Sequence, residues 1–327
     1  MSATSPFFFN PKIGLGCMNL SHAYGSPVAE ENAIQALQRA LDMGYRHFDT
    51  ATLYGGGKNE TLLGKAIMHR RQEFFLASKC GMANVDGKKE INGRPENLRQ
   101  QCEASLKRLG TDHIDLYYLH RLDMNVPIEE SVGALGDLVK EGKIGGVGLS
   151  EISTETLRRA HAEYPITALQ SEYSLWTRNP ELGTLAACKE LGITFVAFSP
   201  LARGFLTGVV TSQAELEDKD IRRNMPRFDE EHYPRNLALL QDYMALSQEW
   251  GISPAQLALA WVLAQGDHVV AIPGTRFEKH MEDNLAADSV QLSALQVATL
   301  SELINQHTVA GPRYNAAQQQ EIDTEEF

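Results

Sequence analysis

Four polar side chains stand at or just after the ends of consecutive strand-like runs. Asp49 ends one apolar run, and Tyr54 follows it in the glycine-rich segment YGGG. Lys79 and His120 end the next two runs. A tyrosine phenol has a pKa of about 10, and a neighbouring ammonium lowers it because it stabilises the phenolate. A carboxylate keeps that ammonium charged, and an imidazole can donate a hydrogen bond to a carbonyl oxygen. The four types together predict a general acid beside a carbonyl group, which suits reduction by an external hydride.

Each of these residues also has an ordinary structural explanation. Asp49 could cap a loop, Tyr54 could be an aromatic residue at a rim, and His120 could be a hydrogen-bonded core histidine. His47 lies two residues before Asp49 and points the same way, so we interpret it as a residue of a barrel layer. Lys79 is the most informative, because a lysine that completes an apolar strand needs a partner for its charge.

A metal site for hydrolysis would use almost the same side chains, namely His47, Asp49, Lys79 and His120. Barrel metallohydrolases usually carry an HxH pair and further histidines at strand ends. Here the pair is HFD, and the later strand-like runs end without histidine. The sequence therefore favours proton donation without a metal.

Eight short apolar runs alternate with amphipathic helical segments along the chain. The runs are 12–18, 46–51, 74–80, 114–120, 144–150, 168–174, 194–200 and 268–274. Their number and the chain length match a (β/α)8 TIM barrel, in which polar groups at the carboxyl ends of strands meet at one face. An open doubly wound sheet is the alternative, but it usually shows GxGxxG after its first strand, and GLGCMNL lacks the third glycine.

We therefore predict an α/β protein with one barrel domain over residues 1–327, extra C-terminal helices and loops on the active face. The long charged segment 202–236 is expected to be such a loop. The polar segment 307–327 is expected to be only partly ordered.

Composition narrows the class of protein. The chain has 327 residues, with 30 Lys+Arg against 42 Asp+Glu and a formal charge of −12, which disfavours nucleic-acid and anionic membrane partners. Its four cysteines show no CxxC or disulfide-dense pattern, which fits a reducing compartment. No apolar stretch reaches the roughly 18 residues of a membrane span. We expect a cytoplasmic protein that acts on a small molecule, and the sequence leaves its oligomeric state open.

Several segments resemble the aldo-keto reductases in order and spacing. They are GYRHFDTATLYGGGKNETLLGKAI, LASKCG, SLKRLGTDHIDLYYLHRLD, VGLSE, LQSEYSLW, FSPLARGFLTG and IPGTRFEKHMEDN. The resemblance implies a (β/α)8 barrel and NADPH bound in an extended form without a Rossmann domain. It also implies a catalytic tetrad of Asp49, Tyr54, Lys79 and His120, with Tyr54 as the proton donor.

The same resemblance implies a cofactor site. Ser150, Glu151 and Gln170 would bind the nicotinamide carboxamide, although many members have Asn where Glu151 stands. Phe198 would stack on the nicotinamide, and Arg276 would hold the 2′-phosphate of the adenosine. The remaining implied cofactor-binding positions are Ser199, Pro200, Leu201, Arg203, Gly204, Gly274, Thr275, His280, Asp283 and Asn284.

The sequence thus predicts an NADP(H)-dependent reductase of aldehydes or ketones, with NADH as a less favoured cofactor. Met18, Leu53, Met82 and Trp176 would form an apolar substrate pocket. An NADPH-binding regulatory subunit of the same fold, associated with a membrane channel, is the alternative function.

Overall fold

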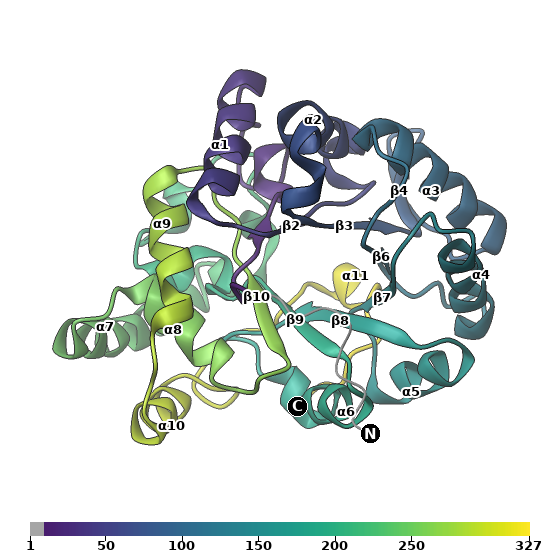
Figure 1. Ribbon diagram of the computed structural model, residues 1–327. Helices are drawn as coiled ribbons and strands as arrows, with labels where there is room; N and C mark the ends of the chain where they lie inside the picture. The colour runs from purple at the N-terminus through teal and green to yellow at the C-terminus, as the bar shows by residue number, and fades with distance from the viewer. Residues whose placement is uncertain (1–9) are drawn as a thin grey trace.

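An eight-stranded parallel sheet forms the centre of the computed structural model, which describes residues 10–327 (Figure 1). Its strands follow one another in chain order around the sheet: β1 (Leu15–Gly16), β2 (His47–Asp49), β3 (Phe75–Cys80), β6 (Leu116–Leu119), β7 (Val147–Ser150), β8 (Ile166–Glu172), β9 (Thr194–Phe198) and β10 (Val269–Ile272). Each predicted strand-like run contains one of these strands or overlaps it. The barrel expected from the sequence is therefore confirmed.

The first and last strands meet at a seam that closes the ring. Ile13 and Ala271 form a parallel bridge, and the Gly14 N–H donates to the Ala271 carbonyl oxygen at 2.8 Å. Two residues further along, the Gly16 N–H donates to the Pro273 carbonyl oxygen at 3.2 Å. A Cβ atom on Gly16 would lie 2.8 Å from the backbone oxygen of Ile272, so only glycine allows this approach.

Helices surround the sheet, because parallel strands need crossover connections. They are α1 (Glu30–Met43), α2 (Lys58–Ile67), α3 (Pro95–Leu109), α4 (Ile128–Lys140), α5 (Thr154–Glu163), α6 (Thr184–Leu191), α8 (Pro254–Leu263) and α9 (Glu278–Ala286). Local signals set their ends: α1 stops at Gly44, which has φ 111°, and the Ser253 side chain accepts from the Gln256 N–H at the start of α8.

Residues 10–327 form two apolar cores. A small one fills the barrel interior with side chains such as Ala77, Tyr118 and Val196. A larger one lies between the strands and the surrounding helices and includes Phe48, Leu135 and Trp261. The interior layer closes the barrel beneath the face where the strands end, so the polar strand-end residues stand on a packed floor.

Several elements lie outside the predicted barrel pattern. An antiparallel hairpin of β4 (Met82–Val85) and β5 (Lys88–Ile91) follows β3, in a region outside the eight strand-like runs predicted from the sequence. Segment 202–236, expected to be an irregular loop, contains four short 3-10 turns and the start of α7 (Tyr233–Trp250). Two further helices, α10 (Ala294–Leu303) and α11 (Ala316–Gln319), follow the last barrel helix, in agreement with the expected C-terminal helices.

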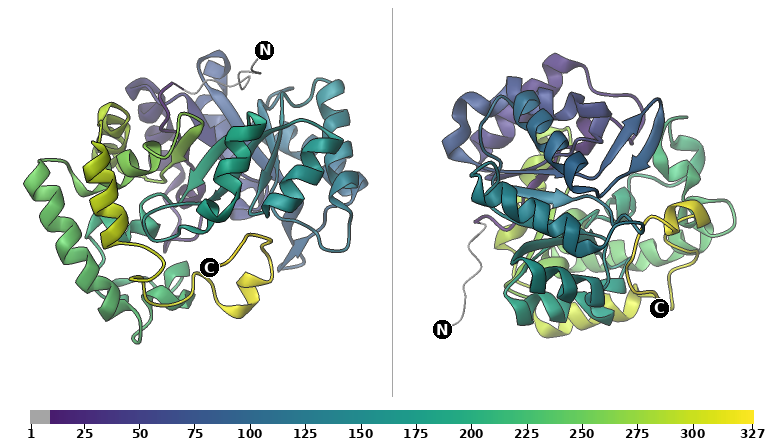
Figure 2. Two further views of the ribbon diagram at one scale, coloured as in Figure 1. Left: turned by 90° about the horizontal axis from the view of Figure 1, so that it is seen from below. Right: turned by 90° about the vertical axis from the view of Figure 1, so that its right-hand side faces the viewer.

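The C-terminal segment lies over one end of the barrel, as the two views of Figure 2 and the position of α11 in Figure 1 show. The Asp323 carboxylate accepts hydrogen bonds from Ser153 Oγ at 2.9 Å and Thr156 Oγ1 at 2.6 Å. The Asp323 N–H donates to the Glu151 carbonyl oxygen at 3.0 Å. Partial order was expected for residues 307–327, and within this segment Asp323 is hydrogen-bonded to residues at and after the end of β7. Among residues 10–327, no helix is long and apolar enough to cross a membrane.

Candidate active site

The Lys79 ammonium joins two of the predicted catalytic side chains. It forms an ion pair with the Asp49 carboxylate at the end of β2 and donates to the Thr50 carbonyl oxygen at 2.9 Å. Lys79 Nζ also lies 3.2 Å from the Tyr54 hydroxyl oxygen. Lys79 is fully buried, so these three oxygens replace the water that its charge would otherwise require.

A glycine turn brings Tyr54 back over the end of the barrel. Gly55 and Gly56 have φ values of 60° and 63°, which L-residues with side chains rarely adopt. The Lys79 ammonium contacts the Tyr54 ring, with Nζ 4.9 Å from the ring centre. The glycine-rich YGGG segment therefore positions the phenol of Tyr54.

The sequence predicts that Lys79 lowers the pKa of Tyr54, whereas in the structure the pKa of Tyr54 is raised. Burial raises the pKa of Tyr54, and the Lys79 ammonium offsets only part of that rise. Burial lowers the pKa of Lys79, but the nearby Asp49 and Tyr54 outweigh it, so the pKa of Lys79 is raised. Tyr54 therefore carries its proton at neutral pH, as a proton donor must.

Two imidazoles flank the phenol. The His120 ring, at the end of β6, lies 5.8 Å from the Tyr54 ring at an interplanar angle of 82°. The His22 ring lies 5.7 Å from Tyr54, and the sequence analysis missed this residue. Burial, helped by the positive charge of Arg121, holds the pKa of His120 well below its usual range, and burial also lowers the pKa of His22. Both rings are therefore neutral, and each can present an N–H donor.

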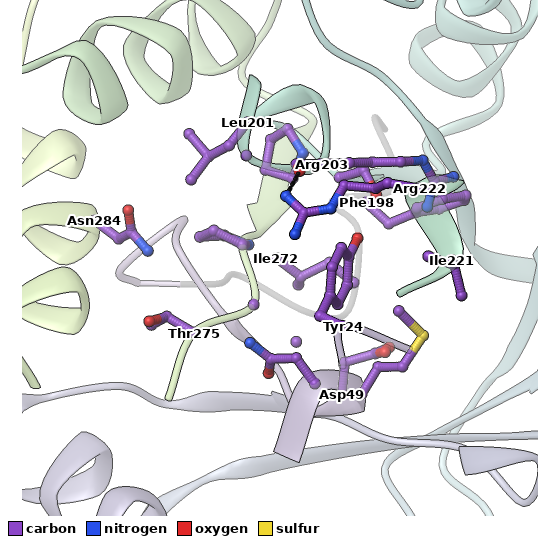
Figure 3. Close-up of a pocket in the computed structure, with 18 of the residues that line it drawn as sticks. Tyr24, Asp49, Phe198, Leu201, Arg203, Ile221, Arg222, Ile272, Thr275 and Asn284 are labelled. Carbon is purple, nitrogen blue, oxygen red and sulfur yellow. Dashed lines mark hydrogen bonds between the residues drawn. The ribbon is translucent and has the colours of Figure 1, made fainter. Parts of the chain in front are cut away.

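A cavity of about 1150 Å³ opens above these side chains (Figure 3). In Figure 3, Tyr24 stands between Arg222 and Ile221 on one side and Thr275 and Asn284 on the other. Most of the predicted site residues line it: Met18, Asp49, Leu53, Tyr54, Met82, His120, Ser150, Gln170, Phe198, Ser199, Pro200, Leu201, Arg203, Gly204, Gly274, Thr275, Arg276, His280, Asp283 and Asn284. Its volume and its lining, which runs from the strand-end side chains to Asn284 in α9, suit an extended ligand.

A strained turn after β9 borders the cavity. Ser199, Ala202 and Arg203 have φ values of 49°, 50° and 56°, and Gly204 follows with 88°. A right-handed residue followed by a left-handed one, as at Leu201 (φ −92°) and Ala202, turns successive N–H groups into a concave shape that can bind an anion, and such strain is characteristic of ligand sites. This turn is therefore a candidate site for a phosphate group.

Glu151 does not reach the cavity, contrary to the sequence-based expectation. Its Oε1 accepts the Glu172 N–H at 2.7 Å, and its Oε2 lies 2.5 Å from Arg313 Nη2. Glu151 is fully buried and has a φ of 56°, which turns the chain away from the line of β7. Its carboxylate is thus occupied by a backbone N–H and a guanidinium, and it does not line the proposed carboxamide site.

Trp176 also differs from its expected place in the substrate pocket. Its indole stacks on Phe205 with ring centres 4.1 Å apart and meets the Phe228 ring at 5.2 Å. It is nearly fully buried and lies outside the residues that line the cavity. Packing between aromatic rings, and not a wall of the pocket, is the role that the structure gives it.

A buried ionic network supports the cavity from the C-terminal side. Glu172 Oε2 lies 2.6 Å from Arg203 Nη2 and 3.1 Å from Arg313 Nε. Burial alone would raise the pKa of Glu172, but Arg203 and Arg313 lower it to about 2. The Arg203 guanidinium also donates to the Tyr314 hydroxyl at 3.1 Å. The Arg203 side chain is therefore already paired, although its backbone belongs to the strained turn.

Several residues that line the cavity were not predicted from the sequence. They are contributed by the first loop, by the end of β6 and by the C-terminal segment: Tyr24, Arg121, Tyr314, Gln318 and Ile322. Residues 18–26 follow the first strand-like run and therefore lie on the active face, which is the one signal that pointed to Tyr24. Within residues 10–327, no three His, Cys, Asp or Glu side chains converge in an arrangement that could hold a metal ion.

Comparison with known proteins gives consistent matches. A model of the aldo/keto reductase family matches residues 12–305. The chain is 44% identical over 305 residues to a probable aldo-keto reductase 1 from Glycine max, covering 93% of this chain and 88% of that protein. It is 42% identical over 311 residues to the aldo-keto reductase yakc from Schizosaccharomyces pombe, whose name specifies NADP(+), covering 93% and 91% of the two chains.

Two solved structures show the same similarity in three dimensions. A glycerol dehydrogenase from Gluconobacter oxydans superposes with a TM-score of 0.82 at 27% identity, covering 92% of this chain and 93% of that one. An aldo/keto reductase from Klebsiella pneumoniae, solved with NADP and acetate, gives a TM-score of 0.70 at 28% identity, covering 93% and 94%.

Proposed function

Because this chain belongs to the aldo/keto reductase family, we propose that it reduces a small aldehyde or ketone to the alcohol with NADPH. The observation that carries this proposal is the buried contact of Lys79 with both Asp49 and Tyr54 beneath the cavity. Overall, the carbonyl compound, NADPH and one proton give the alcohol and NADP+.

When bound, NADPH supplies a hydride for the carbonyl carbon. Tyr54 donates its hydroxyl proton to the carbonyl oxygen as negative charge develops there. The Lys79 ammonium, 3.2 Å from the phenol oxygen, stabilises the phenolate that remains, and Asp49 and the Thr50 carbonyl hold that ammonium in place. Solvent then returns the proton to Tyr54.

Neutral His120 orients the substrate. Its ring stands edge-on beside Tyr54, and its low pKa keeps one ring nitrogen as an N–H donor and the other unprotonated. An N–H donor next to the phenol would fix the carbonyl oxygen between two donors. Gln170 supports the arrangement from below, because its Nε2 donates to Asp49 Oδ2 at 2.8 Å.

The cavity fits an extended dinucleotide. Ser150, Gln170 and Phe198 line its catalytic end, where a nicotinamide would lie against them. At Gly274, a Cβ atom would come within 3.1 Å of the Gly16 carbonyl oxygen, so a glycine fits best at this position of the cavity wall. Asn19 Oδ1 is buried there and accepts no hydrogen bond from residues 10–327, which makes it an available acceptor for the ligand.

Arg276 would distinguish NADPH from NADH. It lines the cavity on the side of Thr275 and Asn284, and its only hydrogen bond among the described residues is a 3.4 Å donation to the Ser26 carbonyl oxygen. Arg276 interacts electrostatically with Glu217, but no carboxylate oxygen of residues 10–327 lies within ion-pair distance of its guanidinium, which suits a 2′-phosphate. The name of the Schizosaccharomyces pombe relative and the NADP complex of the Klebsiella pneumoniae protein support this preference.

The test is an assay of cofactor oxidation with a panel of aldehydes and ketones, with NADPH and NADH compared at equal concentrations. Multiple turnovers of NADPH with at least one carbonyl compound are expected, and alcohol should form in equal amount. Tight NADPH binding without turnover on any member of the panel would instead favour the alternative of a regulatory subunit associated with a membrane channel.

A further inference from the structure

Arg121 is a cavity-lining cation without an acidic partner. It follows His120 directly at the end of β6, and its Nη1 donates to the His120 carbonyl oxygen at 2.7 Å and to Ser150 Oγ at 3.2 Å. Arg121 Nε is buried and has no hydrogen-bond partner among residues 10–327. Over the same residues, no Asp or Glu oxygen lies within ion-pair distance of this guanidinium.

The other cations near it are already neutralised. Lys89, on the hairpin, pairs with Glu321 of the C-terminal segment, and Arg222 pairs with Asp220 at 2.6 Å. Arg203 pairs with Glu172 at 2.6 Å. Arg121 therefore differs from its neighbours: three cavity cations each face a carboxylate of this chain, and Arg121 faces none.

The catalytic end of the cavity consequently carries one uncompensated positive charge. Lys79 is balanced by Asp49, and the two imidazoles are neutral. The charge acts directly on the reacting groups, because the Arg121 guanidinium contributes to lowering the pKa of His120 and offsets part of the rise at Tyr54. Holding a guanidinium partly out of water without an anion is unfavourable, so this end of the cavity is complementary to a negatively charged ligand group.

The cofactor does not supply that group. Its phosphates belong with the strained turn at 199–204 and with Arg276, and the nicotinamide end of NADPH carries a neutral carboxamide. A carboxamide oxygen could accept a hydrogen bond from Arg121, but it would leave the charge unbalanced. A carboxylate can accept two parallel N–H donors from a guanidinium and balance its charge at the same time.

We propose, on the basis of the reductase function above, that Arg121 binds a carboxylate of the substrate and that the preferred substrates are aldehydes or ketones bearing an acid group. The rest of the cavity mouth suits the carbon skeleton of such a compound. Leu53, Met82 and Tyr24 line it with apolar or aromatic surface. The carbonyl oxygen would lie at Tyr54 and His120, with the acid group at Arg121.

Matched pairs of aromatic aldehydes test this directly. The 3- and 4-carboxybenzaldehydes are compared with the corresponding formylbenzamides, which have nearly the same shape but no charge. A preference of about tenfold or more in kcat/KM for the acid is expected in at least one pair, as a charge-assisted hydrogen bond provides. Arg121→Gln should bring that ratio close to one, with little change in the Kd for NADPH.

Lys89→Gln is the matched control. It removes the same charge from the same cavity but from a cation that is paired, so the acid preference is expected to remain. Equal loss of preference in both variants would show that only the general positive potential matters, and it would overturn a specific role for Arg121.

Two other results would contradict the proposal. The first is a wild-type protein whose kcat/KM shows no preference for the acid in any pair. The second is an Arg121→Gln variant whose kcat/KM falls equally for acids and amides, or which binds NADPH more weakly, as expected if Arg121 contacted the cofactor. Binding of benzoate and benzamide to the NADPH complexes of the wild type and of Arg121→Gln gives an independent measurement, and benzoate is expected to bind more tightly than benzamide only to the wild type. If no aldehyde is reduced at all, the reductase proposal fails, and the benzoate comparison still decides whether Arg121 binds a carboxylate.

Discussion

Arg313 Nη2 lies 2.5 Å from Glu151 Oε2, although the two residues are 162 positions apart in the chain. Both side chains are buried, and Arg313 also reaches Glu172. This contact fastens the C-terminal segment to the ends of β7 and β8, next to the proposed nicotinamide site. It also explains why Glu151 does not line the cavity.

Arg313→Met is expected to lower the free energy of unfolding by about 3–5 kcal/mol, because it leaves the Glu151 carboxylate buried without its cation. Denaturant titration measures the loss. Arg159→Met is the matched control, since Arg159 pairs with Glu129 at 2.9 Å on the exposed surface, where solvent screens the pair and its contribution to stability is small. Equal losses in the two variants would show that the buried Arg313–Glu151 contact stabilises the fold no more than the exposed ion pair does.

Tyr54→Phe is expected to reduce carbonyl reduction by about 10²- to 10⁴-fold, because it removes the proton donor and keeps the ring. NADPH titration by protein fluorescence should give an unchanged Kd. Tyr24→Phe removes a phenol hydroxyl from the same cavity, but Lys79 contacts Tyr54 and not Tyr24 among residues 10–327, so this variant should keep far more activity. Near-wild-type turnover of Tyr54→Phe would identify another acid.

The pH profile of kcat/KM for reduction should be flat from about pH 6 to 8 and fall only at alkaline pH. Burial lowers the pKa of His120 and raises that of Tyr54, and the pKa of Lys79 is also raised. An acid whose pKa is raised keeps its proton through neutral pH and loses it above that range. Initial rates in buffers of constant ionic strength measure the profile, and an inflection near about 6.5 would mean that a histidine must titrate for catalysis.

Arg276→Ala should raise the Kd for NADPH about tenfold or more and leave the Kd for NADH nearly unchanged, because only NADPH carries the 2′-phosphate. Equilibrium fluorescence titration with both cofactors measures the two constants. Lys279→Ala removes a nearby positive charge at the same rim and should have a smaller effect. A similar weakening of both cofactors by Arg276→Ala would place the guanidinium elsewhere on the dinucleotide.

The sequence predicts what depends on local pattern. Asp49, Lys79 and His120 end parallel strands, and the carboxyl ends of such strands meet at one face whatever the loops do. The contact of Lys79 with Asp49 follows from that geometry alone. The hairpin β4–β5 carried a local signal that the sequence analysis passed over: its turn is Asp86-Gly87, with φ values of 49° and 80°, and Asp-Gly between two extended runs is typical of a tight hairpin turn.

Long-range partners have no such local signal. Nothing near Glu151 shows that Arg313 will take its carboxylate, and nothing near Trp176 shows that Phe205 will stack on it. Both residues appeared to face the cavity because they stand at or after strand ends. Their orientation is decided by segments that come much later in the chain, through the pairing of charge and the packing of aromatic rings.

The seam between the first and last strands links barrel closure to ligand occupancy. It is short, since β1 spans only Leu15–Gly16, and Gly16, Pro273 and Gly274 on its upper side line the cavity. A dinucleotide resting on these backbones would bridge the two edges of the sheet. Deuterium uptake at the Gly14 and Ala271 amides, whose N–H groups cross the seam to Ala271 and Lys12 oxygens, should therefore slow on saturation with NADPH, more than at amides in the middle of β8.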